Sequence, residues 1–212
     1  MPTTGDVTKA ASRDHFDRWA GDYENDRVSR RLAELQRLAL ATLSLGAGDR
    51  LLDVGCGTGA GVRSAAPGVV SATGIDLSAG MVARATELAA GLPNVTFLQA
   101  DVEALPFPDG AFTALLCTTS FHHYPDPVGA AGEMARVLAP GGRLALADMV
   151  TDRWPMRLAD AVLRRAQSSH VGCHRAGELG GLLAGAGLRP GRPRPALRGF
   201  YAIVPAARLS DR

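Results

Sequence analysis

The sequence predicts an α/β fold in which helices cover both faces of a mostly parallel sheet. Short apolar runs alternate with helical patterns over residues 49–150, an order typical of parallel strands joined by crossover helices. Gly55, Gly57 and Gly59 follow the first apolar run directly. Acidic residues follow the first three runs, and ligands bind at that edge of a parallel sheet.

The N-terminal segment predicts helices that end before the sheet begins. Residues 1–12 are small and polar, and we expect a loose terminus there. Residues 14–45 have a helical pattern in pieces, which Gly46 ends. The side chains expected on one face of this helical region are Leu32, Leu35, Ala39, Thr42 and Leu43.

Cap and turn residues divide the rest of the chain. Ser78 is the expected N-cap of a helix over residues 79–90, and Gly91 follows its end. Asp126, with a proline after it, opens a helix that ends near Pro140. The expected strands cover residues 49–54, 69–75, 95–100, 111–117 and 143–149. Later elements are expected as helices over residues 157–167 and 175–186 and as closing strands over residues 188–195 and 198–205.

Composition and charge exclude several classes of protein. The chain has 212 residues, enough for one domain, and no repeat or linker divides it. The net charge of +2, with Lys9 the only lysine, predicts neither nucleic acid nor a membrane as partner. We expect no secretory signal and no membrane span, which needs roughly 18 apolar residues. Cys56, Cys117 and Cys173 fit neither a disulfide framework nor a zinc site, so we expect a cytoplasmic protein.

The glycine-rich loop after the first strand favours a nucleoside cofactor. A turn without a ligand needs fewer glycines. Gly55, Gly57 and Ala60 also satisfy the dinucleotide-binding pattern, so the spacing leaves an NAD(P)-dependent dehydrogenase open. Asp53 beside the loop would repel a pyrophosphate by a few kcal/mol at about 4 Å. S-adenosylmethionine carries two cationic groups and no phosphate, so Asp53 favours that cofactor.

Acidic residues after the next two strands support the same interpretation. Asp76 lies about 20 residues beyond the loop, where a carboxylate accepts hydrogen bonds from ribose hydroxyls. Asp101 is placed to accept from an adenine amino group while the Val102 backbone meets the ring edge. Each acid alone also fits a surface turn. Three acids after successive strands together are more specific for a nucleoside.

These motifs resemble those of the class I S-adenosylmethionine-dependent methyltransferases of the small-molecule type. The branch is similar to the ubiquinone/menaquinone-biosynthesis and natural-product methyltransferases. The first motif of the family resembles LLDVGCGTG at residues 51–59, and the second resembles GIDLS at residues 74–78. Later blocks resemble QADVEALPFPDGAFT, SFHHYPDP and ARVLAPGGRLALAD. The resemblance covers residues 14–150 and is looser afterwards.

The resemblance implies a Rossmann-like sheet of seven strands in the order 3-2-1-4-5-7-6, with the last strand antiparallel. It also implies one methyltransferase domain over residues 1–212. In that domain, residues 1–45 form a helical lid and residues 46–150 form the cofactor-binding core. Residues 151–212 form an acceptor-side insertion and the closing strands.

The resemblance implies residues for each part of S-adenosylmethionine. Tyr23 belongs to the lid segment and approaches the methionine end, although a surface aromatic patch is the alternative for it. Asp76 holds the ribose. The remaining implied contacts are Gly55, Cys56, Gly57 and Gly59 around the methionine, Leu77, Met81, Asp101 and Val102 around the adenine, and Thr118 beside the cofactor.

Histidines after the fourth strand are candidates for a general base. His122 and His123 lie at the expected mouth of the site, and histidine titrates near neutral pH. Adjacent side chains diverge, so only one faces an acceptor, and we favour His123; a packed loop histidine is the alternative. His170 matches a histidine of the family's acceptor-side region. Two histidines around Cys173, without a nearby carboxylate in the sequence, do not predict a metal site.

The sequence as a whole predicts methyl transfer from S-adenosylmethionine to an O, N or C atom of a small molecule. A natural product or a quinone-like metabolite is the favoured acceptor, and a homodimer is compatible with the sequence. Three alternatives stay open: a cyclisation or other non-methyl reaction in the same pocket, an NAD(P)-dependent dehydrogenase, and a cofactor-binding protein without turnover. The acceptor depends on residues 118–125 and 150–174, which have no single chemical pattern.

Overall fold

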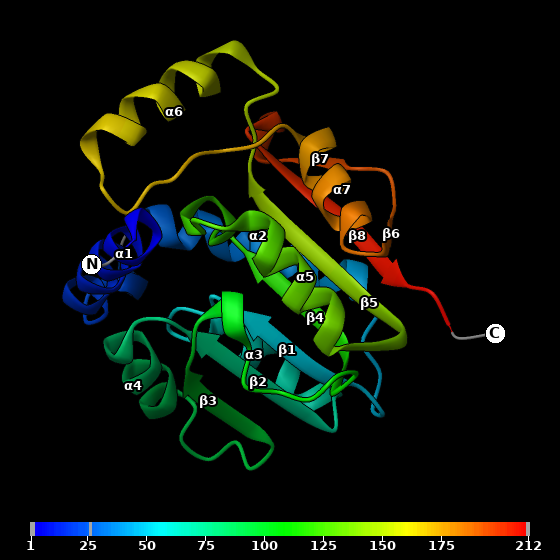
Figure 1. The fold of residues 1–212 in the computed structure, drawn as a ribbon. Helices are drawn as coiled ribbons and strands as arrows, with labels where there is room; N and C mark the ends of the chain where they lie inside the picture. The colour runs from blue at the N-terminus through cyan, green and yellow to red at the C-terminus, as the bar shows by residue number, and fades with distance from the viewer. Residues whose placement is uncertain (1–2, 26, 211–212) are drawn as a thin grey trace.

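The computed structural model describes residues 3–25 and 27–210, and an eight-stranded sheet forms its centre (Figure 1). The strands are β1 (Arg50–Val54), β2 (Ser71–Asp76), β3 (Val95–Gln99), β4 (Phe112–Thr118), β5 (Leu138–Met149), β6 (Leu188–Pro190), β7 (Arg194–Ala196) and β8 (Tyr201–Arg208). They lie in the order β3-β2-β1-β4-β5-β8-β6, and β7 pairs with β8 beside this path. The first five strands are parallel, whereas β8 is antiparallel to β5, β6 and β7.

The sheet confirms the predicted strand order with one correction. In the predicted order 3-2-1-4-5-7-6, β8 takes the position of strand 7, between β5 and β6, and is antiparallel to both. The expectation of seven strands is wrong by one, because residues 188–195 do not form a single strand. The chain turns at Gly191, whose N–H donates to the carbonyl of Pro205 at 2.7 Å. Pro190 and Pro193 have no N–H to donate, so a continuous ladder is interrupted there.

Helices cover both faces of the sheet, close to the predicted ranges. They are α1 (Thr4–Trp19), α2 (Arg27–Leu43), α3 (Ala60–Ala65), α4 (Ala79–Leu88), α5 (Pro127–Val137), α6 (Trp154–Ala166) and α7 (Ala176–Gly185). The 3-10 turns are η1 (Tyr23–Asn25), η2 (Ala66–Gly68), η3 (Val102–Ala104), η4 (Phe121–His123) and η5 (Leu197–Gly199). Two predicted caps are confirmed: Ser78 Oγ accepts from the Met81 N–H at 3.0 Å, and Asp126 Oδ1 accepts from the Gly129 N–H at 2.9 Å.

Two hydrophobic cores lie on opposite faces of the sheet, because successive side chains along a strand point to opposite faces. Leu51 and Leu116 belong to the core under α2 and α3. Leu52 and Leu115 belong to the core under α5 and α7. The predicted apolar face of α2 is confirmed by the buried side chains of Leu35, Ala39 and Leu43.

The N-terminal helix α1 is more ordered than the sequence suggested. A capping box starts it: Thr3 Oγ1 accepts from the Asp6 N–H, and Asp6 Oδ2 accepts from the Thr3 N–H. The expectation of a loose terminus is therefore wrong for residues 4–12, and residues 1 and 2 lie outside the described residues. Asp17 accepts hydrogen bonds from Ser78 Oγ and the Gly80 N–H at 2.5 and 2.9 Å. These bonds hold α1 against the N-terminus of α4, at the carboxyl end of β2.

The described helices include none with the length and apolar character that crossing a membrane requires.

The buried side chains of the central strands should dominate stability. Leu115 is fully buried, so Leu115→Ala should lower the free energy of unfolding by about 2–5 kcal/mol through lost contacts and a cavity. Leu158 is 62% exposed, so the same truncation there should change it by no more than about 0.5 kcal/mol. Urea denaturation measures both, and a cost below about 1 kcal/mol for Leu115→Ala would contradict this account of the core.

Candidate active site

A cavity of about 340 Å³ opens at the carboxyl ends of the parallel strands. The last residues of β2 and β4, Asp76 and Thr118, line one side together with Gly55 and Asp101 of the loops after β1 and β3. The N-terminal helices and η1 line the other side with Lys9, Phe16, Tyr23, Leu32 and Gln36. Open α/β sheets bind ligands at this edge. The structure places most of the predicted site residues around one ligand-sized space, and Asp53, Gly59, His122 and His170 lie outside its lining.

The glycine-rich loop requires glycine for its backbone shape and for its close contacts. Gly55, Gly57 and Gly59 have φ angles of 68°, 53° and 78°, values that side chains disfavour. A Cβ on Gly55 would lie 2.5 Å from the Cβ of Ser120, and a Cβ on Gly59 would lie 2.5 Å from the ring of Phe97. The first two glycines line the cavity together with Cys56, whereas Gly59 lies behind the wall and begins α3.

Asp76 lies on the cavity wall with both carboxylate oxygens fixed by backbone groups. Its Oδ2 accepts from the Gly57 N–H and its Oδ1 accepts from the Ser78 N–H, both at 2.9 Å. Each oxygen keeps a further lone pair, which is free to accept from a ligand hydroxyl. Burial raises the pKa of Asp76 although the two N–H donors oppose that shift. The carboxylate is thus preorganised as an acceptor.

Asp53 lies beneath the loop and differs from its predicted place. Its side chain is fully buried and does not line the cavity. Neither oxygen has a hydrogen-bond partner among the described residues. Burial and the charge of nearby Asp76 raise its pKa well above the usual range. The geometry shows no direct contact between Asp53 and the cavity, and burial beside Asp76 favours the protonated, neutral form of Asp53.

Asp53 and Asp76 are acidic groups without a cationic partner. Within the described part of the chain, no ion pair involves either of them. Each of the other acids that line the cavity has a cationic partner: Glu24 pairs with Arg63, and Asp101 and Glu103 share the single charge of Lys9. The centre of the cavity therefore has uncompensated negative charge, which favours a positively charged ligand and disfavours a pyrophosphate.

The nucleoside end of the cavity contains a contact that the sequence did not predict. Lys9 of α1 lies with its Nζ 2.7 Å from Asp101 Oδ2 and also contacts Glu103. Asp101 Oδ1 accepts from the Glu103 N–H at 3.0 Å. As the only lysine in the chain, Lys9 was noticeable in the sequence, but no local pattern placed it here. The predicted neighbours that also line this region are Leu77, Met81 and Val102.

Aromatic side chains of the predicted lid cover the glycine loop and the histidine side of the cavity. The ring of Tyr23 lies 3.8 Å from the position that a Cβ on Gly57 would occupy. Trp19 packs edge-on against Tyr23, with ring centroids 4.9 Å apart. Phe16 packs edge-on against His123, with centroids 5.2 Å apart. These contacts place aromatic rings beside Gly57 and His123, which both line the cavity.

Thr118 lies at the end of β4 and connects the sheet to the lid. Its Oγ1 accepts a hydrogen bond from Gln36 Nε2 at 3.3 Å, and both residues line the cavity. Gln36 belongs to α2, one turn after Leu32, and the sequence analysis did not select it. The contact places the polar end of Gln36 between the two sides of the cavity.

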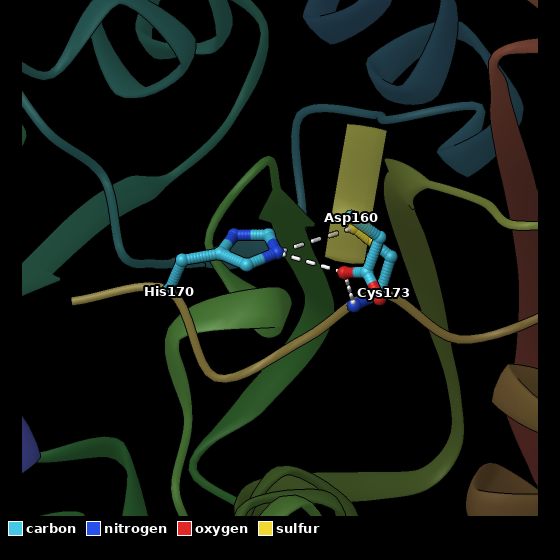
Figure 2. Close-up of side chains that lie close together, drawn as sticks. All are labelled: Asp160, His170 and Cys173. Carbon is cyan, nitrogen blue, oxygen red and sulfur yellow. Dashed lines mark hydrogen bonds and ion pairs between the residues drawn. The ribbon is translucent and has the colours of Figure 1, made fainter. Parts of the chain in front are cut away.

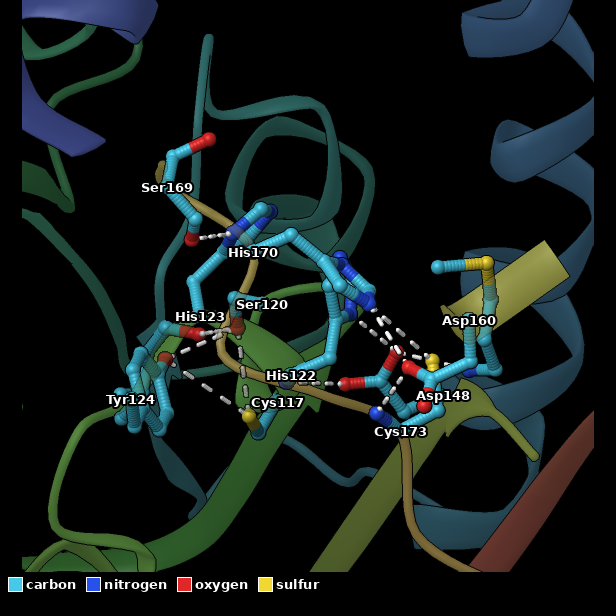
Figure 3. Close-up of polar contacts among 12 residues, drawn as sticks. Cys117, Ser120, His122, His123, Tyr124, Asp148, Asp160, Ser169, His170 and Cys173 are labelled. Carbon is cyan, nitrogen blue, oxygen red and sulfur yellow. Dashed lines mark hydrogen bonds and ion pairs between the residues drawn. The ribbon is translucent and has the colours of Figure 1, made fainter. Parts of the chain in front are cut away.

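His123 is the histidine that lines the cavity. Its Nδ1 lies 2.6 Å from the carbonyl oxygen of Ser169 (Figure 3). A carbonyl only accepts, so Nδ1 carries the proton and Nε2 carries the lone pair. Within the described part of the chain, Nε2 has no hydrogen-bond partner. Burial, followed by the charge of His122, lowers the pKa of His123 to about 3, so the ring is neutral at physiological pH.

His122 points away from the cavity and forms a buried pair with Asp148. Its Nδ1 lies 2.7 Å from Asp148 Oδ1, and its backbone N–H donates to Asp148 Oδ2 at 3.0 Å (Figure 3). Although burial opposes the shift, His122 lowers the pKa of Asp148. Of the two candidate bases, the geometry favours His123, which lines the cavity. The expectation that adjacent side chains diverge is wrong, because the two ring centroids lie 4.0 Å apart.

His170 lies outside the cavity wall, although the resemblance implied an acceptor-side position. It is buried, and its Nε2 lies 2.8 Å from Asp160 Oδ1 (Figure 2). Cys173 completes a group whose polar atoms all lie within 4.8 Å of one another. The expectation that no carboxylate lies near these residues is wrong, because Asp160 supplies one from α6, ten residues before His170.

Comparisons with known proteins agree with this arrangement. A family model described as a methyltransferase domain matches residues 52–146, the segment that carries the glycine loop and the acids after β1, β2 and β3. The core has the fold of the class I methyltransferases. This fold accounts for the predicted strand order and for the position of the cavity.

Curated relatives match the methyltransferase domain over part of their length. The 27-O-demethylrifamycin SV methyltransferase of Amycolatopsis mediterranei is 44% identical over 124 residues, which is 56% of this chain and 46% of the relative. The demethylmenaquinone methyltransferase of Beutenbergia cavernae is 35% identical over 134 residues, 63% of this chain and 55% of the relative. The chain thus spans about half the length of the curated relatives that it matches.

Solved structures share the fold over nearly the whole chain. A methyltransferase of Burkholderia thailandensis, solved with 1,6-didemethyltoxoflavin and S-adenosylhomocysteine, covers 100% of this chain and 92% of its own, with a TM-score of 0.77 at 21% identity. The 4+2 cyclase SpnF covers 99% of this chain and 97% of its own, with a TM-score of 0.76 at 25% identity.

The buried neutral state of His123 makes stability depend on pH. Its pKa of about 3 lies below the unfolded value of about 6.5. Between these values the unfolded chain binds more protons, so stability should fall as pH decreases, by up to about 1.4 kcal/mol per pH unit. Urea unfolding at pH 7.5 and pH 5.0 should show this loss, and His123→Gln should reduce it. If the free energy of unfolding fell equally between the two pH values in the wild type and in His123→Gln, the burial of a neutral His123 ring would be contradicted.

Proposed function

We propose that this protein transfers a methyl group from S-adenosylmethionine to an O, N or C atom of a small molecule. The observation that carries the proposal is Asp76, a carboxylate on the cavity wall beside the glycine loop that lacks a cationic partner within the described residues. A sulfonium and an ammonium group supply the missing positive charge. The fold and the matched relatives support the same reaction.

The cavity residues fit each part of that cofactor. The exposed backbone of the glycine loop would hold the methionine part, and Asp76 would accept from the ribose hydroxyls. Asp101 and Val102 would bind the adenine edge, with Lys9 closing that end. When bound, the cofactor supplies a methyl group whose carbon–sulfur bond breaks, with the electron pair left on sulfur, as the bond to the acceptor forms.

His123 would serve as the proton acceptor for a hydroxyl acceptor. Its Nε2 carries a lone pair on the cavity wall, because Nδ1 donates to Ser169. An imidazole with a low pKa is a weak base, but a hydroxyl oxygen that gains a methyl group becomes a strongly acidic oxonium, so this role applies to an oxygen acceptor. Proton transfer to Nε2 is therefore favourable late in the reaction. The phenyl ring of Phe16 against His123 would keep bulk water from this step.

The names of the relatives support a natural product or a quinone-like metabolite as the acceptor, since they refer to rifamycin and menaquinone compounds. We place the activity in the cytoplasm, supported by Cys56, Cys117 and Cys173, which are buried free thiols.

A second candidate reaction is a cyclisation in the same pocket, which the likeness to a 4+2 cyclase favours. Conversion of S-adenosylmethionine to S-adenosylhomocysteine, followed with candidate acceptors, separates the two reactions.

Removal of the Asp76 carboxylate should weaken cofactor binding. Asp76→Ala removes charge-assisted hydrogen bonds worth about 1.5–3 kcal/mol, so the Kd for S-adenosylmethionine should rise at least about tenfold. Isothermal titration calorimetry measures this Kd. Asp109→Asn is the control, because Asp109 is exposed and does not line the cavity. An unchanged affinity for Asp76→Ala would refute the ribose assignment.

Truncation of His123 should slow the chemical step and leave cofactor binding intact. His123→Ala should lower kcat by at least about tenfold, since a positioned base contributes about 10²–10⁴, while the Kd for S-adenosylmethionine changes less than about twofold. His174→Ala is the matched control, because His174 does not line the cavity. Turnover of His123→Ala near that of the wild type would show that the acceptor needs no base from this residue.

A further inference from the structure

The insertion after β5 has a polar centre at Asp160, a buried residue of α6. Its Oδ1 accepts from His170 Nε2 at 2.8 Å and from the Cys173 N–H at 2.7 Å. Its Oδ2 accepts from Arg164 Nε at 2.9 Å. Although burial opposes the shift, these donors lower the pKa of Asp160 to about 2. Asp160 is thus an ionised anchor for the segment that follows α6, defined here as residues 167–174.

This segment reaches from Asp160 to the back of the catalytic loop at η4. The Ser169 carbonyl accepts from His123 Nδ1 at 2.6 Å (Figure 3). The N–H groups of Val171 and Gly172 donate to the His122 carbonyl at 3.0 and 3.1 Å. Ser169, which contacts His123, is therefore adjacent in the chain to the residue whose side chain Asp160 holds.

The contact with Ser169 decides which nitrogen of His123 is available. A neutral imidazole carries one proton, and its position depends on the hydrogen bond that the ring makes. While the carbonyl accepts from Nδ1, Nε2 stays unprotonated on the cavity wall. Without that carbonyl the two tautomers become comparable in energy, and the form with a proton on Nε2 cannot accept another.

We propose that Asp160 is a positioning residue for His123. It anchors residues 169–173 so that the Ser169 carbonyl holds His123 in the tautomer protonated at Nδ1. The inference rests on the proposed function for its catalytic consequence, since that function uses Nε2 of His123 as the proton acceptor. Its structural part, the tautomer, is independent of any reaction.

A metal ion at Asp160, His170 and Cys173 is a less favourable use of the same group (Figure 2). Both carboxylate oxygens already accept from N–H donors, which an ion would displace. Burial raises the pKa of the Cys173 thiol, whereas metal binding needs the thiolate. The network present among these side chains is complete without an ion.

Histidine ring ¹⁵N NMR on the unliganded protein tests the tautomer directly. In the wild type, His123 should show a protonated Nδ1 and an unprotonated Nε2, and Asp160→Ala should shift it to a mixture of tautomers. Asp49→Ala is the matched control: Asp49 also accepts from a backbone N–H, a hydroxyl and an arginine, but at the start of β1. It should leave His123 unchanged. An unaltered His123 signal in folded Asp160→Ala would overturn the proposal.

A double-mutant cycle tests the catalytic consequence. Asp160→Ala should lower kcat about tenfold in the wild type and less than about twofold in the His123→Ala background. The KM for S-adenosylmethionine should stay within about twofold in both. Equal losses of kcat in the two backgrounds would mean that Asp160 acts independently of His123, and would contradict the proposal.

A second variant and the activity of the wild type separate the tautomer proposal from the proposed function. Should Asp160→Ala fail to fold by circular dichroism, His170→Ala removes the other half of the same anchor and should give the same tautomer mixture and the same cycle. If the wild type converts no S-adenosylmethionine with any acceptor, the proposed function fails while the tautomer result stands on its own. If His123→Ala retains full turnover, positioning by Asp160 has no catalytic effect, although methyl transfer itself remains supported.

Discussion

The site depends on burying the acids Asp53 and Asp76 side by side at the glycine loop without a cation among the described residues. Both carboxylates are buried or held by backbone N–H groups, and neither has a cationic partner within the described residues. Such an arrangement costs folding free energy unless a ligand supplies positive charge. The loop must also consist of glycines for its backbone to approach that ligand. The site therefore selects for a cationic nucleoside before any contact with the acceptor is considered.

Local patterns explain why much of the fold was predictable. Strand periodicity, the Ser78 and Asp126 caps and the glycine loop each involve residues close in sequence, and the structure confirms them. The capping box of α1 was missed because the polar residues before it suggested a loose terminus. The additional strand was missed because two prolines and Gly191 divide a segment that reads as one strand.

Long-range contacts explain what the sequence did not predict in the site. The pairing of Lys9 with Asp101 joins residues 92 positions apart, and the contact of His123 with Ser169 spans 46 positions. No periodicity specifies such pairs. Asp160 was missed for the same reason, since only the return of the chain after α6 brings it to His170. The segment after β5 thus contains the contacts that we propose orient His123.

Calorimetric titration of the unmodified protein with S-adenosylmethionine and with NAD⁺ tests the central claim most directly. The uncompensated acids predict that S-adenosylmethionine binds at least about a hundredfold more tightly, a difference of about 2.7 kcal/mol. S-adenosylhomocysteine lacks the sulfonium charge, so its affinity should exceed that of NAD⁺ by a smaller factor. Tighter binding of NAD⁺, with no detectable heat from the sulfonium compound, would contradict the account of the site.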